Sequence, residues 1–388
     1  MDAVIISGLL SVNDFVIAGD TVFFCGRNTY YDMGFFGHFN IQDFFFGTHS
    51  YTVSDYTFNS VSGHLNTFNK MVTYIENGER RFAAIGQTPQ GNYVTAEVEY
   101  HPSVPEYHYI IGELDIAYNE SLLDITQTDN YVVTGGFKVP GVDPWPSFRI
   151  YEKTSLFAAS GPQDNVKYFF ETGSITTYYN GTQLLLSHLQ ADIFAVAAFW
   201  RPTSITADAG TYIGKYDITN QNVTHSGSIR TTQNSYLGGW KLCGMTSLGS
   251  ATSFYLLENA ELNKQNYLAN LIFELDLSIW SPNFPPNINV RYRPDPLLQS
   301  IDSQGVITDF VSNGFYVATP YMLGYYNSMA TATVNNCYNS TQYTPSNLSM
   351  NQTLVTSNTF TVQEGSVNVF QTYVGQPLNL VVELGCYE

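Results

Sequence analysis

Short runs that alternate apolar and polar residues recur along the chain, and most lead through a polar turn into a denser apolar run. The clearest example is DFVIAGDTVFFCG, from Asp14 to Gly26, in which Gly and Asp separate two β-type runs. Alternation with a period of two, a turn rich in Gly, Asn or Asp, and a run of β-branched and aromatic residues together predict a β-hairpin. Related stretches begin near Met71, Asp124, Leu184, Asp309 and Tyr373.

A second phrase also repeats. It has two apolar residues, usually a glycine, a variable residue, an apolar or aromatic residue, and then Asp or Asn. Its copies are FFGHFNIQ, IIGELDIA, YIGKYDIT, LIFELDLS and MLGYYNSM. Repetition at intervals of roughly 50 to 75 residues, with one longer gap, indicates a repeat or propeller architecture. Glycine within a strand marks a bulge or a close backbone approach, and Asp or Asn suits a turn, so we expect these residues to be structural.

Counting the hairpin phrases gives the number of units. The six starts leave one wide gap, in which we place a further unit between Tyr236 and Ala260. The result is seven units of about 55 to 60 residues, each long enough for about four strands, which is the size of a propeller blade. We therefore predict an all-β fold, a single β-propeller domain spanning residues 1–388, with seven blades and with six or eight as alternatives.

The two ends of the chain suggest how this ring closes. The sequence stops directly after the last hairpin phrase, so the final blade lacks outer strands unless the N-terminal segment supplies one. We expect Val4 to Ser7 to pair with the final blade, because an open sheet edge is an aggregation hazard. No long stretch carries the apolar spacing of an amphipathic helix, and the best helix candidate is the short segment from Leu257 to Tyr267.

Composition agrees with this fold and narrows the partners. Only 12% of the 388 residues are charged, against roughly 25% in an average globular domain, and 15% are aromatic. The net charge of −18 disfavours nucleic acid and anionic membranes, because both attract Lys and Arg. No stretch approaches the roughly 20 apolar residues of a transmembrane helix. We expect a monomer without a cofactor.

The cysteines and histidines form no metal-ligand pattern. The four cysteines are far apart in the sequence and are expected to be buried free thiols. Cys337 and Cys386 are the pair most open to a disulfide, which spacing alone leaves undecided. His101 and His108 flank a turn, but no third ligand accompanies them. We therefore predict no metal site.

DFVIAGDTVFFCG together with GFFGHFNIQDFF resembles a group of secreted or surface-associated proteins from gut Bacteroidetes. The similarity is clear over Val12 to Phe46 and recurs in weaker form along the chain. His38 and Asn40 depart from the commonest form of the second phrase. The resemblance implies a propeller-like fold and a secreted, periplasmic or outer-membrane-associated location, with any signal segment removed before Met1. It carries over no catalytic residue.

Enzyme motifs are absent from the sequence, which contains no G-x-S-x-G, no H-E-x-x-H and no phosphate-binding P-loop. The alternative kept open is a polysaccharide-processing enzyme, a glycosidase or lyase, with a carboxylate pair at a channel mouth. Candidates by proximity are Glu97, Glu99, Glu113 and Asp115. Glu97 and Glu99 alternate along one strand, so they share a face, which we expect to be exposed to solvent.

Binding is the more natural interpretation of an aromatic-rich surface. Trp200 and Arg201 follow an apolar strand, and Trp145 stands in VDPWPSF beside two prolines. Exposed Trp rings can stack on sugar faces, and Arg adds hydrogen-bond donors. We predict a non-enzymatic extracellular or cell-surface module that binds a protein or a glycan through Trp145, Trp200 and Arg201.

Overall fold

A computed structural model describes twenty-nine β-strands and no α-helix over the placed part of the chain. The described residues are 3–6, 10–29, 32–40, 50–57, 65–101, 106–113, 120–138, 145–153, 166–168, 170–172, 178–201, 210–220, 222–231, 241–247, 253–262, 267–276, 288–293, 305–309, 314–319, 322–326, 350–353, 359–361, 368–374 and 376–385. Within them, no helix is long and apolar enough to span a bilayer. The all-β prediction is confirmed. The helix candidate is wrong, because Leu257 lies in a strand and Tyr267 begins the next.

Within the described residues, strands β2 to β13 and β15 to β25 form six consecutive antiparallel units, numbered 1 to 6 below. Unit 1 consists of β2 (Leu10–Ala18), β3 (Thr21–Asn28), β4 (Met33–Asn40) and β5 (Ser50–Thr57). Unit 2 consists of β6 (Thr67–Glu76), β7 (Glu79–Gln87), β8 (Tyr93–His101) and β9 (Glu106–Glu113). Unit 3 consists of β10 (Glu120–Gln127), β11 (Tyr131–Lys138), β12 (Trp145–Glu152) and β13 (Val166–Tyr168). Unit 4 consists of β15 (Tyr178–Gln190), β16 (Ile193–Arg201), β17 (Gly210–Asp217) and β18 (Asn222–Thr231). Unit 5 consists of β19 (Lys241–Ser247), β20 (Ser253–Leu262), β21 (Tyr267–Asp276) and β22 (Ile288–Arg293). Unit 6 consists of β23 (Gly305–Asp309), β24 (Gly314–Thr319) and β25 (Met322–Tyr326).

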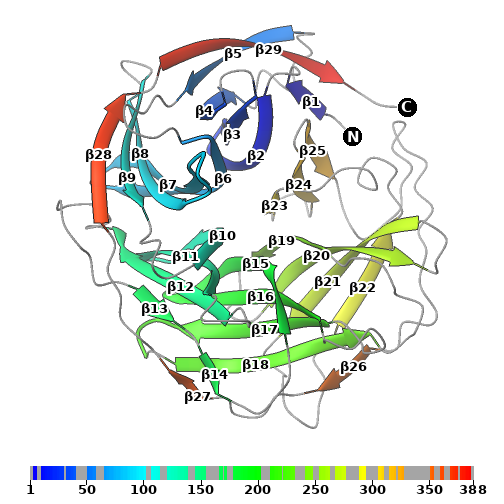
Figure 1. Ribbon diagram of the computed structural model, residues 1–388. Coiled ribbons are helices and arrows are strands. Elements are labelled where there is room, and N and C mark those ends of the chain that lie inside the picture. Colours follow the sequence, from blue (N-terminus) through cyan, green and yellow to red (C-terminus); the bar gives the residue numbers. More distant parts are fainter. Residues whose placement is uncertain are drawn as a thin grey trace.

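The first strand of every unit lies toward a common centre. Figure 1 shows β2, β6, β10, β15, β19 and β23 innermost, with the later strands of each unit further out. Each of these first strands contacts the first strand of the next unit, and β23 also contacts β2. The six inner hairpins are the hairpins that the sequence predicts from Asp14 to Asp309, including the one placed in the wide gap.

The C-terminal segment does not form the seventh predicted hairpin. Its strands, which we call the C-terminal belt, run around the outside of the units in reverse order (Figure 1). They are β26 (Met350–Thr353), β27 (Thr359–Thr361), β28 (Asn368–Val374) and β29 (Gln376–Gly385). The first pairs with β18, the second with β14 (Phe170–Thr172), the third with β9 and the last with β5. The prediction failed because a hairpin pattern in sequence cannot show that its two strands pair with different neighbours.

The N-terminal strand lies between the belt and unit 6. Strand β1 (Ala3–Ile6) pairs with β29 on one side and with β25 on the other, both antiparallel. Units 1 and 6 therefore belong to one nine-stranded sheet, joined through β29 and β1. This pairing satisfies the backbone groups of β1 on both of its edges.

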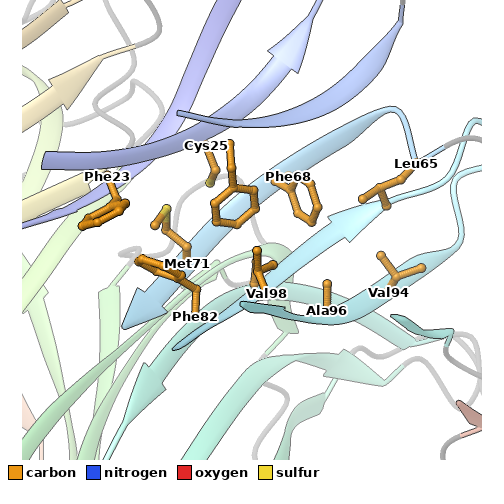
Figure 2. Close-up of a cluster of buried hydrophobic side chains, with 11 residues drawn as sticks. Phe23, Cys25, Leu65, Phe68, Met71, Phe82, Val94, Ala96 and Val98 are labelled. Atoms are coloured by element: carbon orange, nitrogen blue, oxygen red, sulfur yellow. The ribbon is translucent and has the colours of Figure 1, made fainter. Parts of the chain in front are cut away.

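The hydrophobic core lies between the faces of neighbouring units. One cluster joins units 1 and 2, and Figure 2 shows Phe23 and Cys25 on one side of it facing Phe68, Phe82 and other residues of unit 2 on the other. Two further clusters join units 2 with 3 and units 3 with 4. The second strands of units 2 and 4 are buried along both faces, and their sequences are therefore continuous apolar runs, FAAI at residues 82–85 and FAVAA at residues 194–198. Cys25 is a buried free thiol, as predicted, whereas Cys337 and Cys386 lie outside the described residues.

The glycine that ends three of the hairpin phrases has a steric cause. In units 1, 2 and 3 the innermost strand carries a β-bulge, which shifts its register against the second strand. A Cβ atom added at Gly26 or Gly136 would lie 1.8 Å from the carbonyl oxygen of Ser11 or Ser121, and one added at Gly86 would lie 2.3 Å from that of Thr67. Only glycine fits opposite these bulges.

The second repeated phrase marks the third strand in units 1, 4, 5 and 6, and the fourth strand in unit 2. The predicted turn function of its acidic residue is confirmed at Asp217. This carboxylate accepts hydrogen bonds from the backbone N–H and the side-chain amide of Asn220, at 3.0 and 2.7 Å. The bond from the backbone N–H lowers the pKa of Asp217.

Candidate functional site

The backbone register places the predicted ligand residues on two neighbouring units. Trp145 begins β12 and pairs with Lys138 at the end of β11. Trp200 and Arg201 end β16, where they pair with Tyr179 and Tyr178 of β15. The side chains of these residues lie outside the part that the structure describes, so their contacts stay a prediction.

Trp145 and Trp200 nevertheless lie at corresponding edges of units 3 and 4. Each stands where the second strand passes to the third, at the end opposite the turn that joins the first two strands. Those turns lie side by side, since Asp192 in the turn of unit 4 accepts hydrogen bonds from the backbone and side-chain N–H groups of Asn130 in the turn of unit 3, at 3.0 and 2.8 Å. The opposite edges, which carry Trp145 and Trp200, therefore also lie on one side of the molecule. We call this side the strand 2–3 edge.

The carboxylates considered for catalysis are held by an arginine. Arg81 Nη1 lies 2.5 Å from Glu97 and 2.6 Å from Glu99, and Arg81 Nε lies 2.8 Å from Glu76. Glu97 and Glu99 share a face, as predicted, but the expectation of a solvent-exposed face is wrong. Glu97 is only 4% exposed. Burial raises the pKa of Glu97, and the guanidinium of Arg81 opposes that rise.

Tyr74 completes this ion-pair network. Its hydroxyl donates to Glu97 at 3.5 Å, and Lys153 of unit 3 lies 5.6 Å from the centre of its ring. Burial and then the charge of Glu97 raise the pKa of Tyr74. Arg81 thus forms ion pairs with Glu76, Glu97 and Glu99, although its single positive charge balances only one of these carboxylates. This engagement favours a structural function for the three side chains.

A second buried charged group lies on the inner strands. Asp14, Lys70 and Asp124 follow the bulges of β2, β6 and β10, so they occupy equivalent register positions in three consecutive units. We call these three residues the inner-strand hub. Lys70 Nζ lies 3.6 Å from Asp14 Oδ1, and both side chains are largely buried, at 14% and 10% exposure.

Each aspartate of the hub also bonds to the backbone of the next unit. Asp14 Oδ2 accepts the N–H of Met71 on β6 at 2.8 Å, and Asp124 Oδ2 accepts the N–H of Leu186 on β15 at 2.6 Å. Hydrogen bonds to a charged acceptor are stronger than neutral ones. The hub therefore fastens unit 1 to unit 2 and unit 3 to unit 4.

Burial dominates the acid–base properties of the two aspartates of the hub. It raises the pKa of Asp14 and raises that of Asp124 to about 7, in both cases against the opposing charge of Lys70. Burial by itself lowers the pKa of Lys70, but the two carboxylates outweigh it, so that this pKa is raised. A lysine between two aspartates therefore stays charged, and the proton that the hub can gain goes to a carboxyl group.

Metal-binding side chains do not gather anywhere in the described part of the chain: no three His, Cys, Asp or Glu residues form a set that would hold an ion. On the backbone, His108 stands opposite Glu99 and His101 opposite Glu106, so the two histidines are not paired across the strands. Asp115 lies outside the described residues, and of Glu113 only the backbone is described.

Comparison with solved structures gives distant matches, including two from Drosophila. No protein-family model and no curated protein matches the chain. Among solved structures, extracellular domains 1–2 of Drosophila Semaphorin 1b align over 81% of this chain and 72% of their own, at 8% identity and a TM-score of 0.40. Drosophila Plexin A, in a complex with Semaphorin 1b, aligns over 84% of this chain and 86% of its own, at 7% identity and a TM-score of 0.44. A likeness at this level does not extend to partner or activity.

The hub and the Arg81 network are buried charged groups that the sequence did not reveal. One signal was present for the hub, because Asp14 and Asp124 both open a hairpin phrase at the same offset from its turn. Lys70 takes the equivalent position in unit 2, but because lysine differs from aspartate in charge and shape, a comparison of the hairpin phrases does not match it to Asp14 and Asp124. No local pattern connects Arg81 with Glu97, which approach each other only when β7 pairs with β8.

Proposed function

We propose that the chain forms a six-bladed β-propeller, closed where units 1 and 6 meet through β1 and β29, and that it serves outside the cell as a non-enzymatic binding module. The six blades are the six units, with the C-terminal belt as additional outer strands. Support comes from the contacts that link each first strand to the next and β23 to β2. A secreted or cell-surface location and a monomeric state belong to the same proposal.

The ligand-binding surface is the strand 2–3 edge. The observation that carries this assignment is the matching position of Trp145 and Trp200 in neighbouring units, with Arg201 beside the second. Two aromatic residues and a guanidinium along one edge suit the apolar faces and hydroxyl groups of a glycan, and they equally suit an aromatic-anchored protein contact. The partner is a glycan or a protein.

The experiment compares the unaltered chain with Trp145→Ala, Trp200→Ala and Arg201→Ala on a glycan array and against candidate partner proteins. We expect each Trp variant to reduce binding at least tenfold, because a buried aromatic anchor is worth about 2 kcal/mol or more. Ile75→Ala is the matched control, since Ile75 is 57% exposed and lies near the Asn77–Gly78 turn, at the opposite edge. Equal binding by the Trp variants and the control would refute the assignment.

The polysaccharide-processing alternative needs two carboxyl groups that reach one substrate. Among the described residues, Glu97 and Glu99 pair with Arg81, and Asp14 and Asp124 bond to backbone N–H groups. This engagement favours the binding module. Release of products from plant or host polysaccharides by the purified chain would establish the alternative.

A further inference from the structure

The inner-strand hub has more negative than positive charge. When all three groups are ionised, Asp14 and Asp124 carry two negative charges and Lys70 one positive charge, so the hub as a whole has one negative charge in excess. An uncompensated charge in the interior costs free energy and is relieved by a proton, by water entry or by a structural opening.

One proton at Asp124 removes this excess while keeping the contact with unit 4. A protonated carboxyl group retains a carbonyl oxygen that accepts hydrogen bonds, so it can still accept the N–H of Leu186. Lys70 and Asp14 then remain as a balanced ion pair. Loss of that proton strengthens the bond from the N–H of Leu186 but leaves Asp124 as a buried carboxylate, and the burial outweighs the bond because it has the largest effect on the pKa of Asp124. Separation of β10 and β15 then improves the solvation of this carboxylate.

The groups around Asp124 show why its own proton is the charge that changes with pH. Lys70 of β6 and Asp14 of β2 act on its pKa, β11 places Gly135 opposite it, and β15 supplies a backbone N–H. Of the other described charged groups on the strands that pack on β10, Glu76 and Glu99 pair with Arg81, Arg80 donates to the hydroxyl of Thr73, and Glu79 is exposed to solvent. Arg81 of β7 and Glu97 of β8 pair with each other, and His188 of β15 lies 2.8 Å from the carbonyl oxygen of Ala191.

We propose that Asp14, Lys70 and Asp124 form a proton-operated clasp, which holds the junction of units 3 and 4 closed when Asp124 takes up a proton and loosens it when the proton leaves. The clasp acts at the centre of the molecule, away from the strand 2–3 edge. Its consequence is a chain that is tighter in mildly acidic than in alkaline surroundings, in the direction expected for a carboxyl group whose pKa is raised on folding.

The test follows stability against pH in Asp124→Asn and in Asp20→Asn. The asparagine at 124 keeps an acceptor for Leu186 and cannot titrate, whereas Asp20 is an exposed turn residue and serves as the matched control. For the unaltered chain and for Asp20→Asn, we expect the urea midpoint to fall as the pH rises from 5 to 8. For Asp124→Asn, we expect most of that fall to disappear. Parallel pH profiles for the two variants would overturn the proposal.

A second measurement needs no substitution and covers the case in which Asp124→Asn does not fold. NMR titration of the side-chain carboxyl carbons in the unaltered chain should give Asp124 a midpoint near neutrality. Amide exchange at Leu186, corrected for its intrinsic pH dependence, should quicken over the same range. A carboxyl midpoint below pH 5 contradicts the clasp, and so does exchange at Leu186 that is independent of pH.

Discussion

Substituting Gly136 tests whether the bulges of the inner strands set the sequence of the hairpin phrases. An alanine Cβ at this position would lie 1.8 Å from the carbonyl oxygen and 2.6 Å from the carbonyl carbon of Ser121. Real Cβ atoms essentially never come within 3.0 Å of another atom, so β10 must move by about 1.2 Å. The clashing atoms belong to the backbone, so no side-chain rotation relieves the contact.

The free-energy cost of this movement depends on the contacts between β10 and β11 near Gly136. The Ser121 hydroxyl accepts the N–H of Phe137 at 3.2 Å, and the Leu122–Gly136 pair adjoins the bulge. Loss of one such bond costs about 1 kcal/mol, and overpacking adds about 1–3 kcal/mol. We expect Gly136→Ala to lower the free energy of unfolding by about 2–4 kcal/mol.

Urea unfolding followed by intrinsic fluorescence measures this loss, with Gly91→Ala as the matched control. Gly91 has a φ of +84° and no atom within 4 Å of an added Cβ, so its substitution costs backbone strain of about 1–2 kcal/mol without a clash. Gly86→Ala, with a contact at 2.3 Å, should lie between the two and remains measurable if Gly136→Ala fails to fold. Similar losses for Gly136→Ala and Gly91→Ala would refute the steric reasoning.

Two other substitutions test polar contacts of the fold. Arg81→Met removes the partner of Glu97, which is 4% exposed, and should lower the free energy of unfolding by about 3 kcal/mol. Adding Glu97→Gln should restore part of this loss in a double-mutant cycle. An Arg81→Met variant within about 0.5 kcal/mol of the unaltered chain would contradict the network. Asp192→Ala removes the hydrogen-bond acceptor of Thr128 and Asn130 and should lower the stability measured by thermal unfolding by about 1–2 kcal/mol. Asp20→Ala, in the turn of unit 1, should change the stability little. Equal effects of the two substitutions would argue against this contact between turns.

Local patterns in the sequence predicted the inner part of the fold well. The hairpin from Asp14 to Gly26 and its relatives could be recognised because turn residues and alternation act within about a dozen positions. The outer strands could not be assigned in this way. The phrase that begins at Tyr373 looks like the others, but β28 and β29 pair with strands from the first third of the chain.

Burial at the candidate sites was harder to infer. Alternation correctly placed Glu97 and Glu99 on one face, but their spacing does not show that Arg81 on the adjacent strand covers that face. The hub combines residues of unlike charge at one repeated position, which a search for similar residues overlooks. That Trp145, Trp200 and Arg201 bind a ligand remains a prediction. The structure adds that Trp145 and Trp200 lie at the same edge of neighbouring units, which the proposed variants test.

The C-terminal belt has a consequence for synthesis. Strand β5 of the first unit pairs Ser50 with Glu383 and Thr57 with Gln376, so this edge of β5 stays unpaired until the chain has been made as far as β29. At translation rates of about 5–20 residues per second, that wait lasts roughly 20 seconds to a minute. Throughout it the edge is open to wrong pairing, as is that of β9 for a shorter time. We expect the nascent chain to depend on chaperones until β29 has left the ribosome.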